Sequence, residues 1–434
     1  MSFKAVFIAT MITVGLIVAA MVLNHQRPGA DTAQPSAMFV RATGKCAECH
    51  RQETAAVVHQ FEMSGHAGAN VSCLDCHQAH EGQETLDHRG FVIAKQVTAL
   101  NCSQCHMTEY QQYLRSRHAA PSWSAVAGAQ DFTPEQVAFA EKYHKGAVAR
   151  PANQLALLEG PAAITKGCAV CHSVGKPNAD GSIGTCTACH SRHSASIELA
   201  RMPSTCGQCH MGPDHSQIEV FNESKHGVLF AAQRSVMNLR ADPKRLTCRD
   251  MPVPTCATCH MSGLEGMKVT HDTTDRLSYW LFAAVSDKRP TFQQGQDQMK
   301  ELCKKCHTTG PIERFYDEAE EVLVATNERV REAQALMKGL YDQNLLTPAP
   351  FDEPIEFVYF DLWHYFGRTA KHGAFMGGAD FVQWHGNYEL LLKMSELRHM
   401  ADDLHKSRAA KLGAAKPGAA DETATTPVDP DPVR

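Results

Sequence analysis

The stretch Cys168-Ala-Val-Cys171-His172 is one of eight copies of the pattern Cys-x-x-Cys-His in this chain of 434 residues. In each copy two thiols lie three positions apart, on one side of a helical turn, and a histidine follows. This pattern is the attachment site of a c-type haem: the thiols bond its vinyl groups and the histidine ligates its iron. A single Cys-x-x-Cys would also fit a zinc site or a redox dithiol, but eight copies that each end in His favour haem.

The motifs predict eight covalently bound c haems and assign 16 of the 17 cysteines. The haem-binding cysteines are Cys46, Cys49, Cys73, Cys76, Cys102, Cys105, Cys168, Cys171, Cys186, Cys189, Cys206, Cys209, Cys256, Cys259, Cys303 and Cys306. The proximal iron ligands are His50, His77, His106, His172, His190, His210, His260 and His307. Only Cys248 remains, so the chain has no disulfide framework. Because haem is attached to thiols outside the cytoplasm, we expect a periplasmic protein.

The ends of the chain predict an anchor and a tail. Residues 5–23 carry no charged side chain, and a helix of that length spans roughly 28 Å, about one bilayer core. We therefore predict that residues 1–24 anchor the protein in inner-membrane lipid, although a cleaved signal peptide is the alternative. Residues 25–40 are typical of a linker. Residues 413–434, rich in Ala, Pro, Asp and Thr, are predicted to be disordered.

Between these ends we predict a mainly α fold with little β structure. Residues 41–310 form an octahaem domain of short helices and loops, and residues 311–412 form a helical region. Within 313–342, apolar residues recur every three or four positions from Phe315 through Val322 to Leu340, which predicts a long amphipathic helix. A second such run begins at Leu390. The formal charge of −5, without basic runs, argues against a nucleic-acid partner.

Counting histidines predicts that one iron has an open face. Of 24 histidines, 16 lie outside the motifs. Three of these share a spacing, with an aromatic residue and a serine before the histidine, as in Phe61–His66. The best candidates for distal ligands are His66, His88, His118, His193, His226, His271 and His372. Seven candidates serve eight irons, although His59, His80, His144 and His385 compete for the same roles. An iron that binds substrate needs one open face.

Residues 41–410 resemble the octahaem hydroxylamine oxidoreductase family. The stretch from Cys206 through Met-Gly-Pro-Asp214-His215 to Ser224-Lys225-His226-Gly227 carries the resemblance best. The resemblance implies a helical haem protein, a homotrimer, and catalysis at the fourth haem. It also implies that Asp214 and His215 lie over that haem, where an acid and an imidazole can hand protons to a small nitrogen ligand. An aromatic hydroxyl accompanies them in the family. Tyr279 is our candidate, with Phe282 as the alternative occupant of that position.

Two departures from the family's patterns favour reduction over oxidation. In the oxidising members a C-terminal tyrosine is covalently linked to the catalytic haem, and residues 372–387 contain no Tyr. The motif is also never Cys-x-x-Cys-Lys, as in other nitrite reductases. We therefore expect an enzyme that reduces nitrite or hydroxylamine toward ammonia, with electrons from a membrane quinol-oxidising c-type cytochrome. Hydroxylamine oxidation, or a non-catalytic electron conduit with every iron capped, are the alternatives.

Overall fold

The computed structural model describes residues 39–414, together with residues 4, 11 and 13–15. The predicted anchor and the tail beyond 414 therefore fall almost wholly outside the described residues. Within the described part, none of the helices has the length and apolar character that crossing a membrane would require. The chain divides into two compact units: one holds residues up to Ser72 with His193–Ala195, and the other holds the rest.

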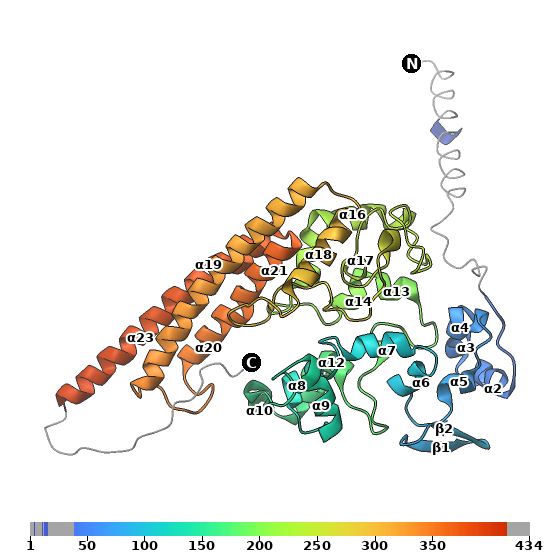
Figure 1. The fold of residues 1–434 in the computed structure, drawn as a ribbon, viewed down its shortest axis with the longest axis horizontal. Coiled ribbons are helices and arrows are strands. Elements are labelled where there is room, and N and C mark those ends of the chain that lie inside the picture. Colours follow the sequence, from blue (N-terminus) through green and yellow to red (C-terminus); the bar gives the residue numbers. More distant parts are fainter. Residues whose placement is uncertain (1–3, 5–10, 12, 16–38, 415–434) are drawn as a thin grey trace. The chain divides into compact units, whose positions relative to one another are not determined.

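The first unit carries the first haem motif on a short helical cluster (blue in Figure 1). Its helices are α2 (Lys45–Glu53), α3 (Ala55–Glu62) and α4 (Gly65–Gly68). The buried Glu62 carboxylate lies 2.5 Å from the Arg51 guanidinium and accepts the N–H of Ala42. This ion pair joins α2, which holds the motif, to α3.

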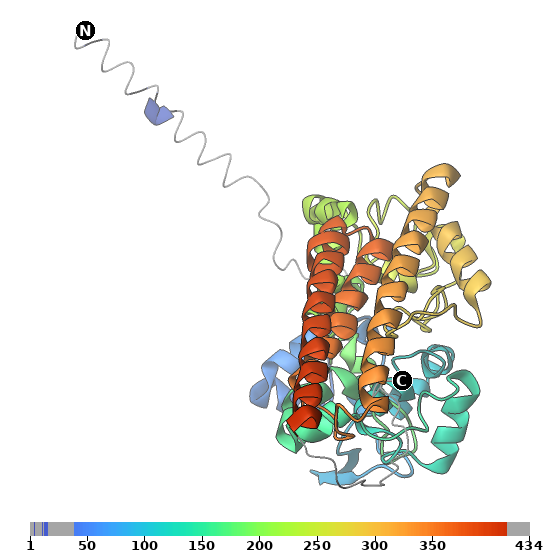
Figure 2. The same cartoon turned by 90° about the vertical axis from the view of Figure 1, so that its left-hand side faces the viewer.

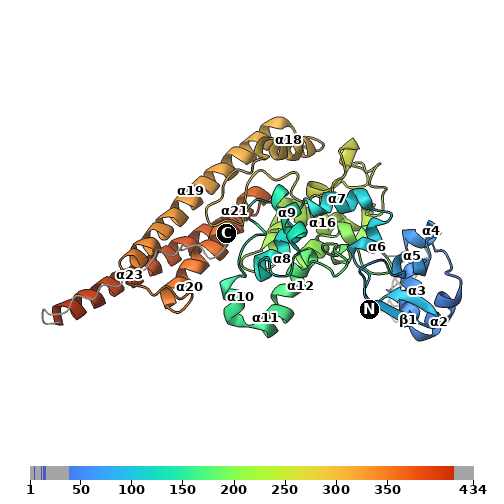
Figure 3. The same ribbon diagram turned by 60° about the horizontal axis from the view of Figure 1, so that its bottom comes forward.

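The second unit begins with short elements that hold the remaining motifs. They are α5 (Cys73–His77), β1 (Thr85–His88), β2 (Phe91–Ala94), α6 (Ala99–Ser103), α7 (Met107–Leu114), α8 (Ala120–Ala127), α9 (Pro134–Tyr143), α10 (Gln154–Glu159), α11 (Pro161–Lys166), α12 (Cys168–His172), η1 (Ser173–Gly175), η2 (Cys186–Ala188), α13 (Ile197–Arg201), α14 (Pro203–Gly207), α15 (Gln217–Glu223), α16 (Lys225–Gln233), η3 (Arg234–Val236), α17 (Cys256–His260), η4 (Leu264–Gly266) and α18 (Phe292–Cys303). Loops connect them, as Figure 3 shows.

Three motifs coincide with a whole helix, namely α5, α12 and α17. A helical turn brings positions one and four of a motif to the same side, as two bonds to one porphyrin require. Thr255 caps α17 by accepting the N–H of Thr258, whose hydroxyl in turn accepts from the Thr255 N–H. In the described residues the only sheet is the hairpin of β1 and β2, paired from Thr85–Ala94 to His88–Phe91. The prediction of a mainly α fold with little β structure is confirmed.

The C-terminal region consists of three helical segments, which form a bundle (Figures 1 and 2). The first is α19 (Thr309–Asp342). The second joins α20 (Pro354–Phe360), the π-helix η5 (Asp361–Gly367) and α21 (Arg368–Met376) without a break. The third joins α22 (Ala379–Val382), the π-helix η6 (Gln383–Tyr388) and α23 (Glu389–Ala414). Gly377, at φ 76°, adopts the left-handed conformation that lets the chain reverse between the last two segments.

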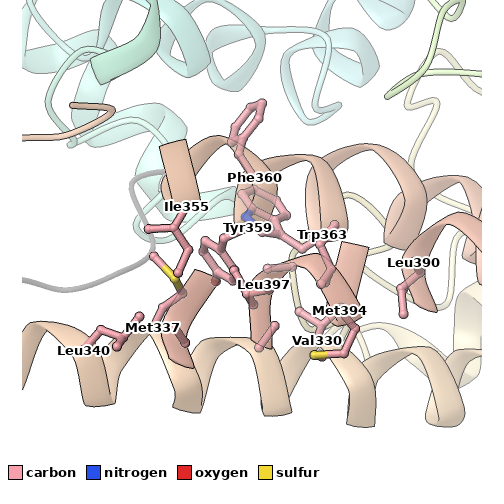
Figure 4. Packing of buried hydrophobic residues seen from close by; sticks show 14 of the residues in the cluster. Val330, Met337, Leu340, Ile355, Tyr359, Phe360, Trp363, Leu390, Met394 and Leu397 are labelled. Carbon is pink, nitrogen blue, oxygen red and sulfur yellow. The ribbon is translucent and has the colours of Figure 1, made fainter. Parts of the chain in front are cut away.

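The core of this bundle is apolar, and each of its segments contributes to it (Figure 4). Met337 and Leu340 of α19 pack with Trp363 of η5 and Leu397 of α23, and all four are at most 1% exposed. The long helix predicted over 313–342 is therefore confirmed as α19. Near its start Tyr316 and Leu323 are buried, whereas their neighbours Phe315 and Val322 are exposed or half-buried.

Candidate active site

The fourth motif is held in place by a hydrogen bond behind its histidine. The motif forms α12, and the ring of His172 is tied through Nδ1 to the carbonyl oxygen of Ser122 on α8, at 2.8 Å. Since a carbonyl can only accept, Nδ1 carries the proton and donates it. Nε2 of His172 is then the unprotonated nitrogen that a metal needs, and this second partner fixes the ring's orientation.

Asp214 and His215 lie beside this motif, in the turn between α14 and α15. Nδ1 of His215 is 2.5 Å from Oδ2 of Asp214. Both side chains lie near enough to His172, in the fourth motif, to act on it electrostatically. Burial alone would raise the pKa of Asp214, but the hydrogen bond from His215 and the nearby Arg368 charge lower it below its ordinary value. Asp214 is therefore a carboxylate near neutral pH.

Two further residues, which sequence reasoning missed, converge on the same carboxylate oxygen. Nδ1 of His364 is 3.8 Å and Nη1 of Arg368 is 3.9 Å from Oδ2 of Asp214. His364 belongs to η5, and Arg368 is the first residue of α21. Short π-helical stretches often occur at functional sites, so this irregularity is a structural signal for the pair. The sequence offered only a weaker one, a histidine and an arginine four residues apart in a helical run.

Phe282, not Tyr279, is the aromatic residue of this group. The Phe282 ring lies 5.2 Å from that of His215. Tyr279 instead bonds through its hydroxyl to Glu320, and its ring packs against Phe375 at 5.4 Å. The structure therefore does not bring Tyr279 together with Asp214. The irregular segment around residue 280 turns Tyr279 toward α19, and Phe282, the alternative we considered, stands beside the acid–imidazole pair.

The loop that carries Phe282 is fastened to α21. Nε of Arg368 donates to the Phe282 carbonyl at 2.7 Å. One turn further along the chain, Nζ of the fully buried Lys371 donates to the carbonyl of Ala283 and to the hydroxyl of Ser286, both at 2.8 Å. Burial, together with the nearby Arg368 charge, lowers the pKa of Lys371 to about 7. These bonds hold the Phe282 ring in a fixed place.

Three predicted distal ligands lie against motif histidines. Nε2 of His118 faces Nε2 of His210, in the sixth motif, at 3.4 Å. The His271 ring lies parallel to that of His190, in the fifth motif, at 6.4 Å. The ring centroids of His226 and of His307, in the eighth motif, are 6.0 Å apart. None of these three pairs includes His172, the histidine of the fourth motif.

The other predicted distal ligands are His66, His88, His193 and His372. His372 is buried, and its ring lies 4.7 Å from that of Phe282. His66 and His193 belong to the first unit, which holds the first motif. His88, at the end of β1, is exposed. Among the competing histidines, His385 bonds to Asp380 at 2.7 Å.

The residues of the second unit fit c-type haem. Two imidazoles that ligate one iron from opposite faces need their nitrogens roughly 4 Å apart, because each metal–imidazole bond is about 2 Å. The His118 and His210 nitrogens face each other at 3.4 Å, close to this separation. The thiols of all 17 cysteines are free of disulfides. Buried ring nitrogens without a hydrogen-bond partner, such as Nδ1 of His271, also occur near the motifs.

Neighbouring motifs touch through their cysteines. The thiols of Cys102 and Cys186 are hydrogen-bonded, which joins the third and fifth motifs. A second contact joins Cys206 to Cys256, of the sixth and seventh motifs. The fourth motif reaches the sixth, since Cys171 bonds to the carbonyl of Gln208 at 3.8 Å. Porphyrins attached at these places would therefore lie close together.

Comparisons with known proteins agree with this architecture. The family model described as "Seven times multi-haem cytochrome CxxCH" matches residues 69–354, which contain seven of the eight motifs, because the motif of Cys46 precedes them. A curated protein of Kuenenia stuttgartiensis, "Probable nitrite reductase-hydroxylamine oxidoreductase fusion protein", is 24% identical over 390 residues. The alignment covers 76% of this chain but 42% of the relative, so the chain spans less than half of that protein's length.

Two solved structures share the fold. A "Hypothetical multiheme protein" superposes with a TM-score of 0.70 at 22% identity, over 87% of this chain and 100% of the other. A chain of a Kuenenia stuttgartiensis "reducing HAO-like protein complex" superposes with a TM-score of 0.65 at 18% identity, over 85% of this chain and 86% of the other. At these identities the likeness establishes the mainly helical multihaem fold.

Proposed function

Since this chain belongs to the family of multihaem cytochromes with Cys-x-x-Cys-His motifs, whose haems are covalently attached, we propose that it is an octahaem enzyme that reduces nitrite, hydroxylamine or both toward ammonia. Reduction takes place at the haem of Cys168, Cys171 and His172. The family match begins after the first motif, so the haem of Cys46 and Cys49, and with it the total of eight haems, is part of this proposal. The relative's name supports the choice of nitrogen substrates.

The observation that carries the proposal is the Asp214–His215 pair beside His172. The three imidazole pairs of the second unit belong to the fifth, sixth and eighth motifs, whereas an acid–base pair accompanies the fourth. A haem that only transfers electrons has no need of a carboxylate and a histidine held 2.5 Å apart. A haem that reduces a nitrogen–oxygen bond does, because each oxygen leaves as water and requires protons.

The residues of this chain supply protons and hold the substrate. Nitrite becomes ammonia and two waters by taking up six electrons and seven protons, and hydroxylamine becomes ammonia and one water by taking up two of each. The haem, when bound, supplies the open metal face and the electrons. Asp214 accepts the Nδ1–H of His215 and so leaves Nε2 of His215 as the nitrogen that exchanges protons. His215 is partly exposed, so water can restore its proton after each transfer.

The remaining parts of the proposal concern the surroundings of the enzyme. Electrons arrive from a membrane quinol-oxidising c-type cytochrome and pass between the haems whose motifs touch. The protein works in the periplasm, attached to inner-membrane lipid through residues 1–24, and assembles as a homotrimer. These expectations rest on the haem chemistry, the apolar N-terminal run and the family resemblance.

The test is an assay of the full-length holoprotein with reduced methyl viologen as electron donor. We expect oxidation of the viologen when nitrite or hydroxylamine is added, with ammonium as product. The control is the Cys168→Ser/Cys171→Ser variant, which lacks the fourth haem and keeps the others; it should lose turnover. If the wild-type protein consumes neither substrate faster than this variant, the proposed function is wrong.

A further inference from the structure

Arg368 fixes which nitrogen of His364 carries the proton. Nη1 of Arg368 lies 2.7 Å from Nε2 of His364. A guanidinium has only donors and stays protonated, so Nε2 of His364 must accept, and the ring proton sits on Nδ1. Burial and the neighbouring Arg368 charge hold the pKa of His364 well below its ordinary value, so the ring is neutral. His364 is therefore a fixed hydrogen-bond donor that cannot shuttle protons through its ring.

This donor is directed into the Asp214 group but has no partner there. Nδ1 of His364 is buried and makes no hydrogen bond. Oδ2 of Asp214, at 3.8 Å, is beyond hydrogen-bonding distance and already takes the proton of His215. A buried N–H without an acceptor is costly, so the site is incomplete until an oxygen atom reaches it. A small ligand beside Asp214 can provide that oxygen.

The charges of the group decide which ligand suits it. The Asp214 carboxylate by itself repels an anion. Arg368, whose side chain is 7% exposed, holds its positive charge 3.9 Å from that carboxylate and offsets it. With His364 neutral, the group formed by these three residues has no net charge and presents an unused donor. An anion whose oxygens only accept hydrogen bonds, such as nitrite, fits this arrangement better than uncharged hydroxylamine, whose O–H and N–H groups also donate.

We propose that His364 and Arg368 form an oxyanion-binding element of the fourth-haem pocket, which selects a small nitrogen oxyanion over an uncharged nitrogen ligand. This inference rests on the proposed function, since it deepens the choice of substrate at the same site. Arg368 is a positioning residue, because it acts through His364 and through its charge. His364 provides the hydrogen bond to a ligand oxygen.

The test compares nitrite and hydroxylamine in the His364→Phe variant of the full-length holoprotein. Phenylalanine keeps the ring stack on Phe360, which has a centroid separation of 4.2 Å and an interplanar angle of 18°, but removes the Nδ1–H. We expect the dissociation constant of nitrite, titrated into the oxidised protein and followed by its visible spectrum, to rise about tenfold or more, the loss of one hydrogen bond. The KM for nitrite should rise likewise, and the KM for hydroxylamine should stay within about threefold.

A matched control exists in the other π-helix. His385 of η6 also stacks on a phenylalanine, Phe381, and pairs with an aspartate, but it is 61% exposed. His385→Phe should leave both constants unchanged. The variant His364→Asn, whose side-chain amide can donate from near the position of Nδ1, should recover part of the nitrite affinity.

Arg368 variants supply a second measurement that does not depend on one substitution folding well. Arg368→Lys keeps the charge and should retain more nitrite affinity than Arg368→Met. The inference is wrong if His364→Phe weakens nitrite and hydroxylamine equally, or changes neither. These outcomes are separate from a failure of the proposed function, in which the wild-type protein would bind nitrite without reducing it.

Discussion

Replacing Asp214 by asparagine should slow the reduction of nitrite about 10²- to 10³-fold while leaving the haems intact. General acid–base catalysis contributes about 10²- to 10⁴-fold. Asparagine keeps the shape of the side chain. Its amide oxygen can still accept from Nδ1 of His215, which in the wild-type protein lies 2.5 Å from the charged Oδ2 of Asp214. It lacks the negative charge that the carboxylate holds beside the His215 ring. We therefore expect the lower part of that range rather than the whole of it.

The assay is kcat for nitrite with reduced methyl viologen, measured together with the visible spectrum of the oxidised and reduced protein. Asp380→Asn is the matched control, since Asp380 also pairs with a histidine, His385, at 2.7 Å, but at an exposed position. That control should keep kcat within about twofold of the wild-type value. If Asp214→Asn, with an unchanged spectrum, also stays within about threefold, then Asp214 has no part in proton delivery and the reasoning fails.

Three other perturbations test the rest of the structure. His118→Ala should remove the partner that faces His210 and so add a second high-spin signal to the electron paramagnetic resonance spectrum; an unchanged spectrum would exclude His118 as a ligand. Lys371→Met should lower the free energy of unfolding in denaturant by about 2–4 kcal/mol, because its buried oxygen acceptors lose their donor; a loss below about 0.5 kcal/mol would contradict this. Burial alone would raise the pKa of Glu62, but hydrogen bonds from Arg51 and a backbone N–H outweigh burial and lower this pKa. The carboxylate therefore stabilises the fold at pH values above its unfolded pKa, and this stabilisation is lost as pH falls through the folded pKa. Glu62→Gln should therefore lower Tm at pH 7 and lose that effect at pH 3, as a thermal melt at each pH would reveal.

The elements that sequence alone could predict are those fixed by local rules. The haem motifs follow from covalent chemistry, which sets the spacing of Cys168, Cys171 and His172. The helix α19 follows from a three-and-four repeat sustained over nine turns. The same repeat could not decide between Phe315 and Tyr316, since adjacent apolar residues fit one helical face almost equally well, and tertiary packing buried the second.

The residues that completed the site depend on packing between distant segments. His364 and Arg368 reach Asp214 because η5 and α21 pack beside the turn after α14, about 150 residues away in the chain, and no local pattern encodes that contact. Tyr279 and Phe282 lie in a segment without a regular period, so no sequence pattern could assign the directions of their side chains.

The most direct test of the central claim is electron paramagnetic resonance of the oxidised full-length protein, before and after the addition of nitrite. An open iron at the fourth motif predicts one high-spin ferric signal, which disappears when nitrite binds and is missing from the Cys168→Ser/Cys171→Ser variant. A spectrum composed only of low-spin haems, and unaltered by nitrite, would contradict the claim.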